Sequence, residues 1–292
     1  MSIALESAAQ QEAAVPRSRF WGKLLRNRSA AIGLTLVGLF LLLAIVGPSL
    51  VPWDPIATSW TTVRKPPSAA HWFGTDELGR DVLARVLSGA RASLTAGVIS
   101  VSIAVAIGGP LGVAAGYFGG WTDTIISRCT EALLACPFLI LAIALGSVLG
   151  ASLTNAMIAI GIAAAPIFIR LTRGQTLSVK TEDFVEGARA IGLPHRWIIA
   201  RYIIPNIFAP ILVQATLIVA QAIIAEASLS FLGLGQQPPA PSWGAMLSTG
   251  KNFVQQGQWW MSVFPGVAIF FTVLGFNLLG DGLRDALDPR ES

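Results

Sequence analysis

Residues 92–122 read ASLTAGVISVSIAVAIGGPLGVAAGYFGGWT and contain no charged side chain. A helix needs about 20 consecutive apolar residues to cross the hydrocarbon core of a bilayer, so this stretch is long enough to span a membrane. Four more stretches are free of charge and exceed that length: 29–53, 132–169, 202–225 and 252–280. The solvent that decides the fold of this chain is therefore lipid.

The composition of the 292 residues agrees with a lipid environment, because 53% are hydrophobic and only 12% are charged. Soluble domains carry about 25% charged residues, so the composition disfavours a soluble enzyme. The mean hydropathy of +0.65 excludes intrinsic disorder. The formal net charge is +4, but the basic residues are scattered along the chain, which indicates membrane topology rather than nucleic-acid binding.

The charge-free stretches predict an all-α integral membrane protein with six transmembrane helices. Stretch 132–169 is long enough for two of them, and its small and polar middle, 146–152, is typical of a tight turn. The first stretch is longer than the apolar region of a signal peptide, so we expect it to be retained. The predicted helices are at about 30–51, 93–117, 131–149, 153–171, 207–231 and 262–282.

Lys and Arg side chains predict the orientation of these helices. Fourteen of them fall on the side that holds both termini and six on the other side, so the positive-inside rule places both termini in the cytoplasm. The predicted organisation follows the chain: a cytoplasmic N-terminal segment 1–29, a first transmembrane helix 30–51, an extracytoplasmic loop 52–91, a five-helix core 92–283 with a cytoplasmic loop 172–206, and a cytoplasmic tail 284–292.

No catalytic or metal-binding set is visible in the sequence. The chain has no G-x-x-x-x-G-K-[ST] motif for ATP, and Cys129 and Cys136 lie far from His71 and His195. Glu226 is the one acid within an apolar span, near the outer end of its helix. Intramembrane acids are functional by default, which makes Glu226 a candidate gate or pore-associated residue. The alternative is a hydrated acid at the outer boundary that pairs with a neighbouring subunit.

The cytoplasmic loop predicts a helix, a glycine turn and a second short helix. Thr181 is the expected N-cap of a helix over about 182–191, Gly192 the expected left-handed residue after it, and 195–202 the second helix. Phe184, Ala188 and Ile191 fall on one face, which we expect to anchor this elbow to the bundle. The elbow either connects two spans or docks a cytoplasmic protein.

Three motifs resemble permease subunits of binding-protein-dependent ABC importers. Glu186-Gly187-Ala188-x-x-x-Gly192, with Pro205 thirteen residues later, is similar to the E-A-A motif of that family. The second motif is the segment 71–81, and the third is the C-terminal set 229–235, 241–244 and 280–289; both look like those of the second permease in dipeptide, oligopeptide and nickel systems. The sequence departs from the family pattern at three positions, Gly187 for Ala, Tyr202 for Ile and Ile204 for Leu.

This resemblance implies a type I ABC importer transmembrane domain in the bacterial inner membrane. Its expected partners are a second permease as heterodimer, two ATPase subunits and an extracytoplasmic solute-binding protein, with ATP and Mg on the ATPases and no cofactor or metal in this chain. The expected role is half of the translocation path for di- or oligopeptides or a similar solute. The solute itself stays open between dipeptides, oligopeptides, glutathione-like molecules and nickel chelates.

The resemblance also assigns residues. The expected ATPase-docking residues of the loop are Phe184, Glu186, Gly187, Ala188, Gly192, Leu193 and Pro205. The expected outer-loop signature consists of Gly74, Thr75, Asp76, Gly79, Arg80 and Asp81. The charged residues of this signature form either a solvated face or an internally neutralised loop that packs on the second permease.

Two alternatives belong to other classes of protein. A secondary carrier or channel that works alone would transport solute without any ATPase, and an intramembrane enzyme would need a catalytic set that the sequence lacks. The glycines at 108, 109, 112 and 116 indicate a helix-packing face in the second span rather than a functional site.

Overall fold

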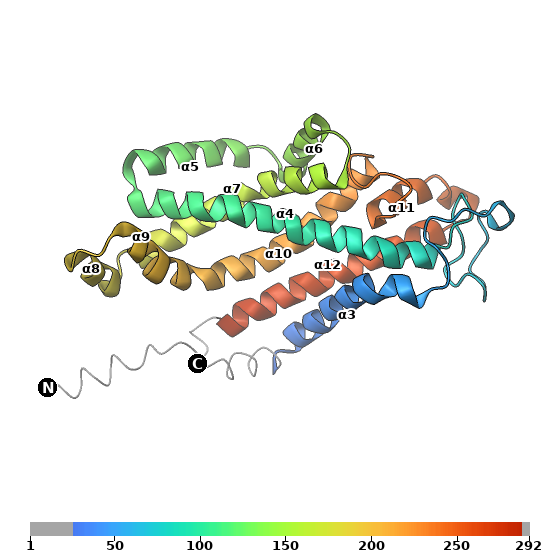
Figure 1. The fold of residues 1–292 in the computed structure, drawn as a ribbon, viewed down its shortest axis with the longest axis horizontal. Coiled ribbons are helices and arrows are strands. Elements are labelled where there is room, and N and C mark those ends of the chain that lie inside the picture. Colours follow the sequence, from blue (N-terminus) through green and yellow to red (C-terminus); the bar gives the residue numbers. More distant parts are fainter. Residues whose placement is uncertain (1–25, 288–292) are drawn as a thin grey trace.

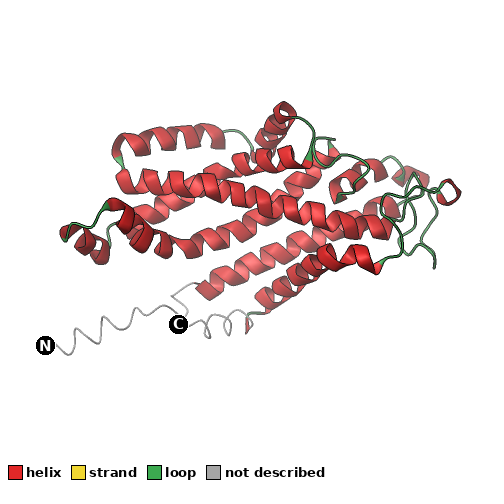
Figure 2. Cartoon of the chain, in the orientation of Figure 1, coloured by secondary structure: helices red, strands yellow, loops and turns green. Residues whose placement is uncertain are grey.

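The computed structural model describes residues 26–287, and this part of the chain is almost entirely helical (Figure 2). Within these residues the one β-bridge is isolated and joins Thr75 to Asp81. The all-α prediction is therefore confirmed. Residues 1–25 of the expected N-terminal segment and 288–292 of the expected tail lie outside the described residues.

Five helices are long and apolar enough to cross a membrane, and a bent pair of helices makes a sixth span if it is counted as one. The five are α3 (Arg28–Leu50), α4 (Val82–Phe118), α7 (Leu153–Val179), α10 (Ile204–Phe231) and α12 (Trp260–Leu287). The bent pair is α5 (Gly120–Leu134) and α6 (Phe138–Leu149). The shorter elements are η1 (Trp60–Thr62), α8 (Asp183–Ala190), α9 (His195–Ile198), the π-helical turn η2 (Ile199–Ile203), α11 (Trp243–Gly250) and η3 (Val254–Gln256).

The predicted third span, 131–149, is wrong as a single helix. The chain bends by 92° between α5 and α6, at residues 135–137. Pro137 has no backbone N–H and disfavours helical geometry at the preceding Cys136, so the apolar run cannot continue as one straight helix. Pro137 instead occupies the position before α6, with an extended ψ of 133°.

Helix α4 begins at Val82, well before the predicted start at residue 93. The Asp81 side chain accepts a hydrogen bond from the Ala84 amide at 2.7 Å and caps the helix. Arg85 and Arg91 led the charge pattern to assign this part to a loop, but Arg85 is buried and donates to the Pro55 carbonyl of the loop that precedes α4, whereas Arg91 is exposed.

Glycines make α4 pack closely on α7. An ideal Cβ atom on Gly108 would lie 2.6 Å from the Ala165 carbonyl oxygen, and one on Gly116 would lie 2.8 Å from that of Arg173. Such distances leave no room for a side chain, so the two backbones touch over several turns. Small residues at four-residue spacing permit this approach between membrane helices, which confirms the predicted packing role for Gly108, Gly112 and Gly116 but not for Gly109, whose Cβ position meets no atom within 4 Å.

The two ends of the bundle differ (Figure 1). The loop between α3 and α4 lies with α11 at one end, and α8 and α9 lie at the opposite end. Helix α3 packs along α12, where the Cβ position of Gly282 meets Ala30 and that of Gly275 meets Leu36. The first span is thus part of the bundle and not a separate anchor.

We expect Gly112→Ala to destabilise the protein by about 1–3 kcal/mol, because overpacking a close contact shifts the backbone. The added Cβ would lie 2.5 Å from the Ile169 carbonyl oxygen. Gly109→Ala is the matched control, since a Cβ there meets no atom within 4 Å. Thermal unfolding of the purified variants in detergent measures the difference. Equal melting temperatures for the two variants would contradict the close contact.

Candidate functional site

The elbow consists of residues 180–203, between the end of α7 and the start of α10. Helix α8 ends in two hydrogen bonds, from the Gly192 amide to the Arg189 carbonyl at 2.9 Å and from the Leu193 amide to the Ala188 carbonyl at 3.1 Å. Gly192 has a φ of +78°, in the left-handed region that favours glycine. Together these features form the Schellman motif, and they confirm the turn predicted at Gly192.

The start of α8 differs from the prediction. Glu182 occupies the N-cap position and makes no side-chain cap, whereas the Thr181 hydroxyl donates to the Ser178 carbonyl at 2.8 Å. Thr181 therefore closes the last turn of α7, and its expected role as the N-cap of α8 is wrong. A hydroxyl bonded to a carbonyl behind it is turned away from the amides of the next helix.

The face that attaches α8 to the bundle also differs. Val185 and Ala188 are buried, and they pack in a hydrophobic cluster with Ile198 and Ile203. Phe184 is 41% exposed and Ile191 is 77% exposed, so the prediction that these two anchor the elbow is wrong. The observed buried face is turned about the helix axis from the predicted one, and Ala188 is common to both.

The exposed side of the elbow combines apolar and charged groups. Phe184, Ile191 and Trp197 expose large apolar surfaces next to the exposed acid Glu186. Among the described residues, no ion pair joins Glu186 to Arg189 or Arg196.

The predicted docking residues occupy different environments. Gly187, Gly192 and Pro205 are exposed, Leu193 is half-buried and Ala188 is buried. Trp197 was not singled out from the sequence, although an aromatic residue in a polar segment was a usable signal.

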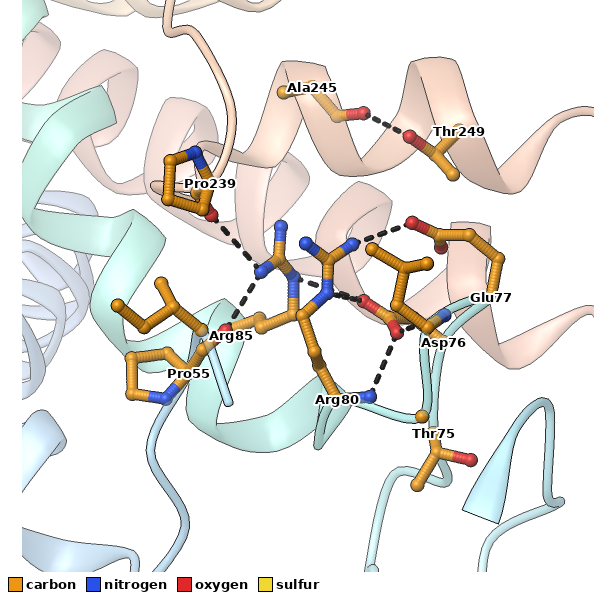
Figure 3. Close-up of polar contacts among 12 residues, drawn as sticks. Pro55, Thr75, Asp76, Glu77, Arg80, Arg85, Pro239, Ala245 and Thr249 are labelled. Carbon is orange, nitrogen blue, oxygen red and sulfur yellow. Dashed lines mark hydrogen bonds and ion pairs between the residues drawn. The ribbon is translucent and has the colours of Figure 1, made fainter. Parts of the chain in front are cut away.

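At the other end of the molecule, the outer loop holds a buried ion cluster (Figure 3). The Arg80 Nε atom lies 2.6 Å from an Asp76 carboxylate oxygen, and its Nη2 atom lies 2.6 Å from Glu77. Arg85 adds an ion pair to Asp76 at 3.3 Å and donates to the Pro55 carbonyl at 2.8 Å. Burial raises the pKa of the Glu77 carboxyl above its ordinary value, and the Asp76 charge adds to the rise.

This cluster corresponds to the internally neutralised loop and not to a solvated face, since two acids and two arginines pair below the surface. Sequence reasoning missed Arg85, which belongs to α4 and reaches back to the loop. Next to the cluster, His71 Nδ1 and Asp81 Oδ2 are 2.8 Å apart and both side chains are buried. Gly74 and Gly79 have φ of +73° and +74°, which fits glycine at both turns.

Glu226 is fully buried between α4 and α10. It accepts a hydrogen bond from Ser93 at 3.0 Å and one from Ser230 at 2.7 Å. The alternative of a hydrated acid at the boundary is therefore wrong, because the carboxyl has no contact with solvent in this chain. The Ser93 hydroxyl joins α4 to Glu226 of α10, whereas Ser230 lies one turn further along α10 itself.

Within residues 26–287, no group of three His, Cys, Asp or Glu side chains is placed to hold a metal ion. Three grooves between helices of the described part have volumes of about 430–440 Å³. The geometry thus presents a helical bundle with a structured loop at one end and an exposed elbow at the other.

Comparison with known proteins matches nearly the whole chain. Residues 108–292 match the family described as binding-protein-dependent transport system inner membrane component, and residues 16–67 match the N-terminal TM domain of oligopeptide transport permease C.

Three relatives illustrate the similarity. The chain is 46% identical over 281 residues to the dipeptide transport system permease protein DppC of Alkalihalophilus pseudofirmus, covering 96% of this chain and 92% of that protein. It is 47% identical over 255 residues to the probable D,D-dipeptide transport system permease protein DdpC of Escherichia coli, with 87% and 85% covered. It is 41% identical over 276 residues to the glutathione transport system permease protein GsiD of Pectobacterium atrosepticum, with 94% and 91% covered.

A solved structure shares the fold. An inward-facing form of the MetNI methionine ABC transporter aligns with a TM-score of 0.55 at 18% identity, covering 70% of this chain and 97% of the other. The expected fold class, an ABC importer transmembrane domain, is confirmed.

We expect Gly192→Val to destabilise the elbow by about 1–3 kcal/mol, because a β-branched residue is strained at a φ of +78°. Gly187→Ala is the matched control in the same helix, where a Cβ meets no atom within 4 Å and alanine is favoured by about 0.5–1 kcal/mol. Limited proteolysis between α7 and α10 measures elbow opening. If Gly187→Ala were cleaved faster than Gly192→Val, the claim that the left-handed turn requires glycine at position 192 would be contradicted.

A second expectation concerns Glu226. Glu226→Leu leaves two buried hydroxyls without their acceptor and is expected to cost about 1–3 kcal/mol. Glu226→Gln retains a carbonyl acceptor and should cost less. Gln221→Leu, at an exposed position of the same helix, should change little. Melting temperatures in detergent give the order, and a Leu variant as stable as wild type would show that the two bonds contribute nothing.

Proposed function

The chain belongs to the family of inner membrane components of binding-protein-dependent transport systems, and on this premise we propose that it forms half of a translocation path for small peptides. Members of this family are multi-pass permeases of bacterial ABC importers and act as transport components, not as enzymes. The observation that carries the choice of solute is the 41–47% identity to dipeptide and glutathione permeases over most of the chain. Dipeptides and glutathione share a free amine, a free carboxylate and at least one peptide-like amide.

We propose that the elbow faces the cytoplasm and docks ATPase subunits. The elbow and the structured outer loop lie at opposite ends of the bundle, which supports an orientation with one on each side of the membrane (Figure 1). The six basic residues between Arg170 and Arg201 favour the cytoplasm for the elbow side. The N- and C-terminal segments, 1–29 and 284–292, then lie on the same side.

The exposed surface of the elbow suits a protein partner. Phe184 and Ile191 offer apolar anchors, and Glu186 offers an unpaired carboxylate among the described residues for an Arg or Lys of the ATPase. Gly187, Gly192, Leu193 and Pro205 shape the backbone around these groups. Buried Ala188 contributes as a spacer that keeps α8 close to the bundle, and not as a contact with the partner.

The proposed assembly contains a second permease, two ATPases and an extracytoplasmic binding protein. The ATPases carry ATP and Mg, and their closure on nucleotide drives the change of access. The outer loop, with Gly74, Thr75, Asp76, Gly79, Arg80 and Asp81, is proposed to present a rigid surface to the second permease or the binding protein. Glu226 is proposed as a residue that holds the outer ends of α4 and α10 together, next to the path.

Proteoliposomes with and without the ATPase subunits test this function. Uptake of dialanine or glutathione with the cognate binding protein should require both ATP and the ATPases. Uptake that persists without ATPases would indicate a carrier or channel that works alone. If neither probe is taken up in an ATP-dependent way, the proposed solute class is wrong. Co-purification of the subunits then tests the proposed assembly separately.

We expect Glu186→Gln to leave the melting temperature nearly unchanged while it weakens assembly with the ATPases by about tenfold, since a charge-assisted hydrogen bond contributes about 1.5–3 kcal/mol. Asp281→Asn, an exposed acid on α12, is the control and should assemble normally. Co-purification at graded ATPase concentrations measures the effect. If Glu186→Gln lowers the melting temperature but assembles normally, Glu186 has a structural role in the loop and its docking role is wrong.

The side of the membrane is tested by labelling single cysteines in intact cells with an impermeant maleimide, after replacing Cys129 and Cys136. A cysteine at Ser178 should be protected from outside, whereas one at Trp72, which is 71% exposed in the outer loop, should react. The reverse pattern would invert the proposed topology.

A further inference from the structure

The elbow contacts a helix to which it is not covalently joined. Helices α7 and α10 continue directly into the elbow, so they follow any displacement of α8. Helix α4 has no such link, yet Val113 and Tyr117 at its inner end belong to the same buried cluster as Val185 and Ile198. Movement of α4 with the elbow can therefore pass through its backbone contact with α7 and through these direct side-chain contacts.

Tyr117 makes the most specific of these contacts. Its side chain is buried, and its hydroxyl is hydrogen-bonded to Nδ1 of His195 at 2.9 Å. The Arg189 guanidinium lies over the Tyr117 ring, 5.2 Å from the ring centre, which is within the range of a cation–π interaction. One side chain of α4 thus touches both the end of α8 and the start of α9.

A second contact holds the neighbouring residue of α4. Lys180, at the end of α7, donates from Nζ to the Gly116 carbonyl at 2.7 Å. Residues that precede α8 and residues that follow it therefore both contact the inner end of α4. These two contacts, Lys180 with Gly116 and His195 with Tyr117, resist sliding of α4 along the elbow.

The rest of α4 is suited to carry a displacement across the molecule. Its 37 residues form one helix, about 55 Å long at 1.5 Å per residue, and its glycine face lies against α7. At its outer end, Arg85 joins the ion cluster of the loop and Ser93 bonds to Glu226. An axial shift at Tyr117 therefore reaches both outer sites.

We propose that Tyr117 is a positioning residue that, through His195, ties α4 to the elbow, so that α4 moves with α8 when the ATPases close. This inference rests on the proposed docking of the elbow and adds α4 to the helices that the elbow drives. The side-chain link consists of the hydroxyl bond to His195 and the ring contact with Arg189. Removing the hydroxyl alone is expected to weaken the coupling of α4 to the elbow while α8 still moves.

Spin-label distances in the reconstituted complex test the link. Labels replace Ala190 on α8, Leu111 on α4 and Phe270 on α12, all exposed positions, in a chain without Cys129 and Cys136. Distances from α12 are measured without nucleotide and after trapping with ATP and vanadate. In the otherwise wild-type chain, both α8 and α4 should shift relative to α12, by about the 1–2 Å typical of helix displacements.

In Tyr117→Phe, the α8 shift should remain and the α4 shift should be reduced, since the ring contact with Arg189 and the Lys180 hydrogen bond are retained. Tyr202→Phe is the matched control, because Tyr202 is the second of the two tyrosines and packs at the elbow through its ring. His195→Ala removes the same bond from an exposed partner, so it tests the link even where the Tyr117 variant fails to assemble. The double variant should be no worse than either single variant.

The outcomes separate the two proposals. An α4 that shifts fully in both Tyr117→Phe and His195→Ala would overturn the role of Tyr117, and so would an α4 that stays still in wild type while α8 moves. An α8 that does not shift relative to α12 in wild type would overturn the elbow docking on which the inference rests. Loss of both shifts in Tyr202→Phe would assign the effect to general damage of the elbow and overturn the specific link.

Discussion

Close packing of α4 on α7 is the contact on which the rest of the structure depends. In lipid, helices gain little from hiding apolar surface, so they associate through van der Waals contact and through small residues that bring backbones together. Gly108, Gly112 and Gly116 supply that approach along the inner half of α4. Because α4 is fixed against α7, the residues at its two ends are fixed as well, which places the elbow cluster and the outer ion cluster on one rigid element.

The charged residues divide into two groups with different physical roles. In the outer loop, Arg80 and Arg85 are buried and balanced by Asp76 and Glu77. Removing one partner from such a cluster leaves an uncompensated buried charge, which is strongly destabilising. At the elbow, Glu186 is exposed, and an exposed charge contributes little to folding and remains free for a partner.

The elbow combines a firm attachment with an open surface. Val185 and Ala188 bury one face of α8, and the left-handed Gly192 sets the turn that follows. The opposite face leaves Phe184 and Ile191 in solvent, where an isolated soluble domain would rarely keep two such neighbours. The proposed docking uses this division, with force received on the exposed face and delivered to the bundle through the buried one.

The sequence by itself determined the features that depend on composition and local backbone chemistry. Runs without charge favour lipid, so the presence of the long apolar helices was predictable, although the bend before α6 and the start of α4 were not. Gly192 followed by Pro194 marks the end of α8 in the same local way. Only the tertiary structure decided which groups meet. The charge pattern assigned Arg85 to a loop, whereas Asp81 caps α4 early and turns Arg85 towards Asp76. The same holds for Glu226 with Ser93 and for Tyr117 with His195, because partners 133 and 78 residues apart are chosen by helix packing and leave no local signal in the chain.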